Sequence, residues 1–243
     1  MKQVSMKVRR DVSIDFLRFV ALTCIVIAHI NPSPLIFQLR NFDVPLMVFL
    51  SGVSFRISGG NNDGYWHYAL KRFKRLILPV WVFLAVYYSI VWIKDGEMLP
   101  LTTMVSYYTL ITPWFVWIIR VFFVIALIAP LVTGTLINFN KWAFLFWSAA
   151  LLVVFEVFCM SGYSQFRFSE YVLMNIPYLI VFALGVKIKE FKAKEVVGIS
   201  AICLSLFFGL LINYKLWGGY FCQLNYLSIR QESTICHIPY SVL

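Results

Sequence analysis

Long apolar stretches, repeated along the chain, are the feature that most constrains what this sequence can fold into. A helix needs about 20 mostly apolar residues to cross a hydrocarbon layer of about 30 Å. The regular alternation of apolar and polar residues that marks strands is absent. The sequence therefore predicts an all-α, polytopic transmembrane helix bundle of about seven spans, of which the second and sixth are short. The spans are expected near residues 14–31, 43–58, 76–93, 114–133, 142–160, 175–188 and 196–214.

The composition also favours a membrane protein over a soluble domain. Hydrophobic residues make up 61% of the chain and charged residues only 13%, and the mean hydropathy is +0.80. Soluble domains average nearer one half apolar and one quarter charged. The lipid bilayer is therefore the first expected partner.

The positive charges predict an orientation. Cytoplasmic loops of membrane proteins collect Lys and Arg. If the seven helices alternate in direction, the large majority of the loop cations fall on the side of the N-terminus. We therefore expect a multi-pass protein of the inner (plasma) membrane with its N-terminus in the cytoplasm. Topology and anionic lipid then explain the net charge of +10, so nucleic acid is not an expected partner.

Two ionisable residues share the first apolar stretch. Arg18 and His29 are eleven residues apart, which on a helix is three turns plus about 20° and a rise of about 16 Å. Both side chains are thus predicted on one stripe, one near each end of the hydrophobic layer. Asp15, one turn before Arg18, is placed to hold its guanidinium. Ionisable groups in such a layer indicate a functional site, and the alternative is that both side chains simply reach the two interfaces.

A second cationic feature precedes the third span. The segment 68–79 reads YALKRFKRLILP, and within it Arg72 and Arg75 are one helical turn apart, so they project from one side. Two guanidinium groups placed in this way can clamp a phosphate by bidentate hydrogen bonds. The alternative is an anchor for the positive side of the membrane.

Other buried polar residues carry weaker hypotheses. Glu156 in the fifth span needs a partner or a proton, and Arg120 in the fourth span is the partner to test. Asp43 stands at the mouth of the second span, where it is a candidate neighbour of His29. Ser51 and Gly52 suit either function or the close packing of helices.

The five cysteines form no CxxC pair, and three of them lie inside predicted spans, where Cys usually fills space. His67 and His237 have no ligand-like neighbours in the sequence. We therefore predict neither a disulfide nor a metal site.

Four short motifs follow one another in order along the chain. The first span holds an Arg and a His with ten residues between them, and the second holds Pro-Leu followed by Ser-Gly. Arg-x-x-Arg precedes the third span, and Trp-Phe-Val begins the fourth. Together, over roughly residues 14–190, they resemble the membrane-bound acyltransferase 3 family. The residues concerned are Arg18 with His29, Pro45-Leu46 with Ser51-Gly52, Arg72 with Arg75, and Trp114-Phe115-Val116.

The resemblance implies an O-acetyltransferase-like enzyme. Such an enzyme moves an acyl group, usually acetyl, from cytoplasmic acyl-CoA to a hydroxyl of a carbohydrate or other cell-envelope acceptor. Arg72 and Arg75 would then hold phosphates of coenzyme A, and Arg18, deeper on the same side, would meet a phosphate or the thioester end. His29 would act as the general base that takes the proton of the attacking hydroxyl. The alternative is that His29 carries the acyl group covalently.

The sequence departs from the family in two ways. Asp43-Val44 stands where His-Met is common, and the chain has about seven helices where about ten are usual. We expect a C-terminally short acyltransferase-like domain over residues 1–215 and an irregular tail over 216–243. Two other functions stay open: a transporter or flippase for an anionic metabolite, with Arg18 and His29 along its path, or an inactive truncated fragment. A transporter often shows an internal repeat, and none is convincing here.

Overall fold

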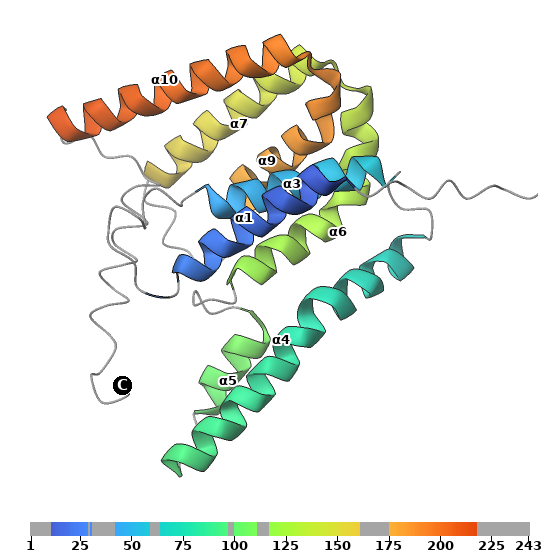
Figure 1. Ribbon diagram of the computed structural model, residues 1–243, viewed down its shortest axis with the longest axis vertical. Coiled ribbons are helices and arrows are strands. Elements are labelled where there is room, and N and C mark those ends of the chain that lie inside the picture. The colour runs from blue at the N-terminus through green and yellow to red at the C-terminus, as the bar shows by residue number, and fades with distance from the viewer. Residues whose placement is uncertain are drawn as a thin grey trace, which may run out of the picture. The chain divides into compact units, whose positions relative to one another are not determined.

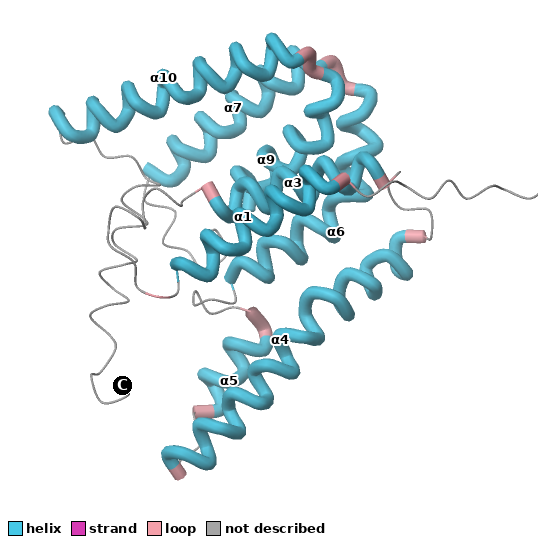
Figure 2. The backbone as a smooth tube through the Cα atoms, in the orientation of Figure 1, coloured by secondary structure: helices cyan, strands magenta, loops and turns pink. Residues whose placement is uncertain are grey.

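The fold is helical throughout the part of the chain that the computed structural model describes, which is residues 11–28, 30, 42–58, 64–96, 100–110, 117–160 and 175–217. Eight α-helices and one short 3-10 helix lie in these ranges, and they contain no strand (Figure 2). The predicted all-α class is confirmed. The helices, labelled in Figure 1, are α1 (Val12–Ala28), α3 (Asp43–Ile57), α4 (Tyr65–Asp95), α5 (Leu101–Tyr108), α6 (Trp117–Asn138), α7 (Lys141–Met160), α9 (Ile176–Lys187) and α10 (Ala193–Trp217).

Each of the seven predicted spans overlaps one of these helices. The eighth helix, α5, was not predicted, because its eight residues, LTTMVSYY, lack a long apolar run. Three helices of the described part, α4, α6 and α7, are long and apolar enough to cross a membrane by length and composition. Many large apolar side chains on α1, α4 and α7 are exposed, as lipid-facing residues are. Together these features describe a membrane protein.

The chain divides into two compact units. The first comprises Met1–Asn140 and Asn175–Ile188, and the second comprises Lys141–Met174 and Lys189–Leu243. The first unit therefore contains α1, α3, α4, α5, α6 and α9, and the second contains α7 and α10. The candidate site residues Arg18, Arg72 and Arg75 all belong to the first unit.

The closest helix contact in the first unit joins α3 to α9 through two glycines. A Cβ atom built on Gly52 of α3 would overlap the carbonyl oxygen of Phe182, and one built on Gly185 of α9 would overlap the carbonyl oxygen of Phe49. The backbone of each helix therefore lies directly against the glycine of the other helix. Small residues allow this close approach between membrane helices.

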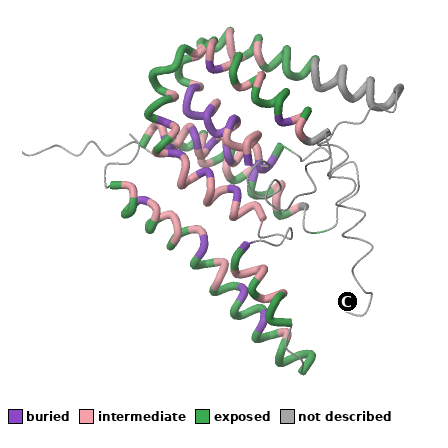
Figure 3. The backbone as a smooth tube through the Cα atoms, turned by 180° about the vertical axis from the view of Figure 1, so that it is seen from behind, coloured by how far each residue is buried: buried purple, intermediate pink, exposed green. Residues whose placement is uncertain are grey.

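An apolar core surrounds this crossing. Val48 of α3, Ile125 of α6 and Phe182 of α9 are almost fully buried and belong to one cluster. Figure 3 colours the buried positions of the backbone purple. Phe55, near the end of α3, extends the cluster to α4, since its ring meets the ring of Tyr68 edge-on at 6.0 Å between centroids. The core therefore fixes the end of α3 against the beginning of α4.

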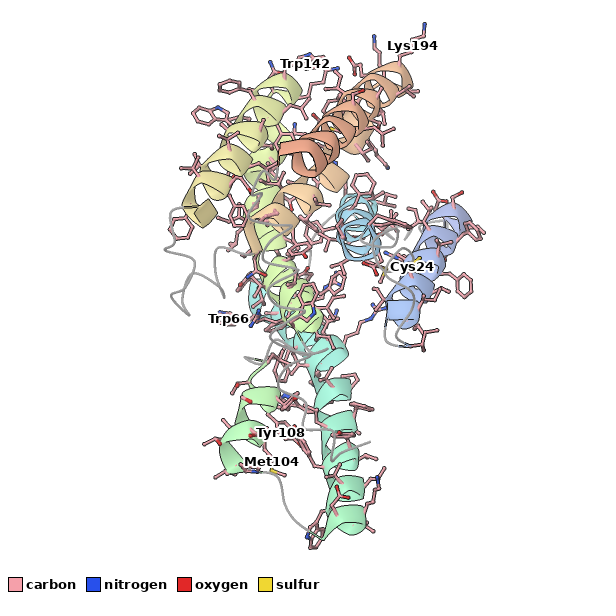
Figure 4. All side chains as sticks on the ribbon, turned by 90° about the vertical axis from the view of Figure 1, so that its left-hand side faces the viewer. Cys24, Trp66, Met104, Tyr108, Trp142 and Lys194 are labelled. Atoms are coloured by element: carbon pink, nitrogen blue, oxygen red, sulfur yellow. The ribbon has the colours of Figure 1, made fainter. Side chains whose placement is uncertain are left out.

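Helix α4 is longer than a membrane span. Its 31 residues extend over about 46 Å, and its first turns carry the cationic segment. Beyond this segment, α5 packs back against α4. The indole Nε1 of Trp81 donates a hydrogen bond to the carbonyl oxygen of Tyr108 at 2.9 Å, and Tyr108 is labelled on α5 in Figure 4.

In the second unit, an ion pair joins the beginning of α7 to the beginning of α10. Lys141 Nζ lies 2.8 and 2.9 Å from the two carboxylate oxygens of Glu195. Glu195 also accepts a hydrogen bond from the backbone N–H of Lys192 at 2.9 Å, as a capping glutamate does at a helix start. The hydrogen bonds from Lys141 and Lys192 lower the pKa of the Glu195 carboxyl below its usual 4.5.

Candidate functional site

Arg18 is held between two helices. It lies on α1, where Nη1 is 3.5 Å from Oδ1 of Asp15, and Nη2 donates a hydrogen bond to Oγ of Ser54 on α3. The predicted contact with Asp15 is confirmed. The side chain of Arg18 remains 40% exposed, so it is accessible to a ligand.

Arg72 and Arg75 lie on the same helix, as predicted, but in different surroundings. The guanidinium carbon of Arg72 lies 5.0 Å from the centre of the Tyr68 ring, a cation–π contact, and the residue is half-buried. Arg75, one turn further along α4, is exposed. One arginine of the pair is therefore fixed by the fold, whereas the other extends into the surroundings.

The last turn of α3 brings Arg18 and Arg72 to one end of the first unit. Ser54 contacts Arg18, and the next residue, Phe55, contacts Tyr68, whose ring lies under Arg72. The beginning of α1, the end of α3 and the beginning of α4 thus meet here. This is the end that the charge pattern predicts to be cytoplasmic. A site of this kind can hold an anionic ligand, because guanidinium groups bind phosphate oxygens in pairs.

His29 and the motif Trp114–Val116 lie outside the described residues. Their places in the site stay predictions. Asp43, the predicted spatial neighbour of His29, is buried at the start of α3. Its Oδ1 accepts a hydrogen bond from the backbone N–H of Val44 at 2.6 Å. The carboxylate thus takes part in the N-terminal turn of α3.

The structure gives other roles to several residues that sequence analysis singled out. Gly52 serves the close contact with α9, which confirms the packing interpretation. Arg120 donates from Nη1 to the carbonyl oxygen of Leu110 at 3.2 Å and so holds the turn that follows α5. Glu156 belongs to the second unit, and its pairing with Arg120 stays a prediction.

The roles of two residues, Ser54 and Lys187, were not recognised in the sequence. Ser54 was missed because a serine inside an apolar helix usually bonds only to its own backbone. Lys187 lies near the end of the predicted sixth span, and in the structure it is fully buried as the last residue of α9. Its Nζ donates to the carbonyl oxygen of Phe139 just beyond α6. In the sequence, Lys187 could have been identified by its position directly after the apolar run 176–186.

Comparison with known proteins returned one match. The model of the acyltransferase 3 family, described as an acyltransferase domain, matches residues 11–237. No curated protein and no solved structure matches the chain. The matched region contains all four of the predicted site residues, Arg18, His29, Arg72 and Arg75.

Proposed function

The chain belongs to the acyltransferase 3 family, and we propose that it moves an acyl group, acetyl in the simplest case, from cytoplasmic acyl-CoA to a hydroxyl of a carbohydrate or other cell-envelope acceptor. The family and the apolar helices make it an acyltransferase of the membrane. The proposal adds the donor, the acceptor class and the residues that act on them. It also places the protein in the inner (plasma) membrane with its N-terminus in the cytoplasm.

The observation that carries the proposal is the position of Arg18 and Arg72 around one turn of α3. Coenzyme A carries several phosphate charges at one end and the thioester at the other. Arg72, with the exposed Arg75 beside it, suits the phosphates because a guanidinium fork matches phosphate geometry. Arg18 on the neighbouring helix meets a phosphate or the thioester end of the same molecule.

The chemical step assigned to His29 is proton removal. The neutral imidazole takes the proton of the acceptor hydroxyl as its oxygen attacks the thioester carbonyl. A new C–O bond forms, the C–S bond breaks, and the proton can pass from the imidazolium to the departing thiolate of coenzyme A. With His29 as a general base, the acyl group passes from the donor to the acceptor in one step. In the alternative, His29 first takes the acyl group as a covalent acyl-imidazole and then passes it to the acceptor in a second step.

The first experiment tests His29 directly. Glutamine is close in size and polarity to histidine, but it neither takes a proton near neutral pH nor forms a reactive acyl adduct. We expect His29→Gln to leave the amount of protein in the membrane unchanged and to lower acyl transfer about 100-fold or more. The measurement is the incorporation of labelled acetyl from acetyl-CoA into the envelope fraction of membranes that contain the full chain.

His67 provides a matched control, because it is exposed at the start of α4 and has no role in the proposed chemistry. His67→Gln should therefore transfer acetyl at the rate of the unchanged protein. Two results would overturn the proposal: near-normal transfer by His29→Gln, or no acetyl transfer by the unchanged chain.

A further inference from the structure

The two partners of Arg18 hold it unequally. The distance of 3.5 Å from Nη1 to Asp15 Oδ1 is at the long limit for a hydrogen bond, and both side chains are partly exposed, at 40% and 31%. Such pairs contribute little. The contact from Nη2 to Ser54 Oγ is much shorter. Ser54, rather than Asp15, therefore decides the direction in which the guanidinium plane points.

In the hydrogen bond between Ser54 and Arg18, the arginine is the donor and the serine oxygen is the acceptor. A serine hydroxyl has one proton to donate and two lone pairs to accept. Ser54 Oγ donates its proton to the backbone carbonyl oxygen of Leu50 at 2.7 Å. The lone pairs are then left to face Arg18, whose guanidinium can only donate.

Among the described residues, this arrangement leaves N–H groups of the guanidinium for a ligand. Arginine has five N–H groups in a rigid plane, and in the part of the chain that the structure describes one is directed to Ser54 and one to Asp15. A planar group whose direction is fixed by Ser54 on a second helix loses little further freedom when it binds an anion. Preorganisation of this kind raises affinity because less conformational entropy is lost on binding.

We propose that Ser54 is a positioning residue that aims the guanidinium of Arg18 at a phosphate of the acyl-CoA donor. The inference rests on the proposed function and adds a residue to the donor site. Ser54 itself touches no substrate. It acts through Arg18, and its effect therefore requires Arg18 to be present.

We expect the hydroxyl of Ser54 to be dispensable for the fold of α3. The carbonyl of Leu50 keeps its ordinary helical hydrogen bond when the serine hydroxyl is removed, and alanine has the higher helix propensity. Ser54→Ala should therefore remain folded and inserted. Ser89 of α4 is a matched control, because its hydroxyl also donates to a carbonyl four residues earlier, that of Ala85 at 2.8 Å, and it is exposed and remote from the arginines in sequence.

The test measures the binding of acetyl-CoA to the full chain in detergent by isothermal titration calorimetry. We expect Ser54→Ala to raise the dissociation constant about tenfold, as for the loss of a hydrogen bond to a charged group. Ser89→Ala should stay within about twofold. Ser54→Thr keeps the hydroxyl and can bond to the same carbonyl, so it should also stay within about twofold.

A double-mutant cycle separates positioning from a general effect on the structure. We expect Arg18→Gln to weaken binding and Ser54→Ala to change it less than about twofold further when Arg18 is already replaced. An effect of Ser54→Ala that is equal in both backgrounds would overturn the inference. So would normal binding by Ser54→Ala while Arg18→Gln is impaired, and the proposed function would then stand. If Arg18→Gln and Arg72→Ala both bind acetyl-CoA normally, the proposed function itself fails.

Discussion

Arg72 and Arg75 show how two identical residues, one turn apart, acquire different properties from the fold. Arg72 lies over the ring of Tyr68, and that ring is buried against Phe55. Arg75 lies at an exposed position of α4. Spacing alone predicts an equivalent pair, but among the contacts of the described residues it is Arg72 whose guanidinium lies against a ring of the core.

This difference leads to a prediction about the two arginines. Arg72→Ala and Arg75→Ala should both weaken acetyl-CoA binding, by about 1–3 kcal/mol each. Arg72→Ala should in addition lower the stability by about 0.5–1 kcal/mol, because the cation–π contact with Tyr68 is lost, whereas Arg75→Ala should not. Titration calorimetry and thermal unfolding in detergent measure the two effects.

Lys74 is the control for charge, since it is an exposed cation of the same helical turn. Lys74→Ala should leave binding nearly unchanged if the guanidinium groups themselves clamp phosphate. Lysine in place of Arg72 or Arg75 should restore only part of the affinity, because an ammonium lacks the fork. Full binding by the double Lys variant would show that the pair is only a topological anchor.

At the scale of the elements, α3 and α9 cross closely because each helix has a glycine at the contact. Gly52 and Gly185 each face a backbone carbonyl of the partner helix. Ser54 and Phe55 follow Gly52 within the next turn of α3. The geometry of the crossing therefore sets the position of the residues that hold Arg18 and Tyr68.

We expect Gly52→Ala and Gly185→Ala to destabilise the protein by about 1–3 kcal/mol or more, because the new methyl group would overlap backbone atoms that cannot move aside. Gly134 of α6 is the matched control, since a Cβ there meets no atom within 4 Å. Gly134→Ala should be neutral or stabilise by up to about 1 kcal/mol through higher helix propensity. Thermal unfolding in detergent compares the three, and equal stability of all three variants would be inconsistent with the close crossing.

At the scale of the whole molecule, the proposed donor site requires that acyl-CoA reach the end where α1 begins, α3 ends and α4 begins. The excess of Lys and Arg on this side predicts that it is cytoplasmic. The far end of α4, with Asp95, is then predicted on the other side.

Reporter fusions test this orientation. A reporter joined at Asn62, between α3 and α4, should be active in the cytoplasmic compartment, and one joined at Asp95 should be active in the opposite compartment. Both fusions should be made in the full chain with protein levels measured as a control. Reporters found on the same side would contradict a membrane crossing by α4 and with it the number of spans.

The sequence by itself determined the helical class and the approximate position of seven helices. It also placed Asp15 beside Arg18, and Arg72 and Arg75 on one helix. All of these depend on residues within a few turns of each other, where apolar runs and the helical repeat decide the result. A short helix with polar residues, α5, carries no such signal, and the sequence did not predict it.

Only the tertiary structure decided which helices meet. The contacts of Ser54 with Arg18 and of Lys187 with Phe139 join residues that are 36 and 48 positions apart. A serine in an apolar helix, or a lysine at its end, has the same local pattern whether its partner is solvent, lipid or another helix. The identity of the partner follows from how the helices pack, as at Gly52 and Gly185, and this packing depends on side-chain shape across the whole bundle. For this reason the sequence could indicate the cations of the site, whereas the residues that position them became evident only in three dimensions.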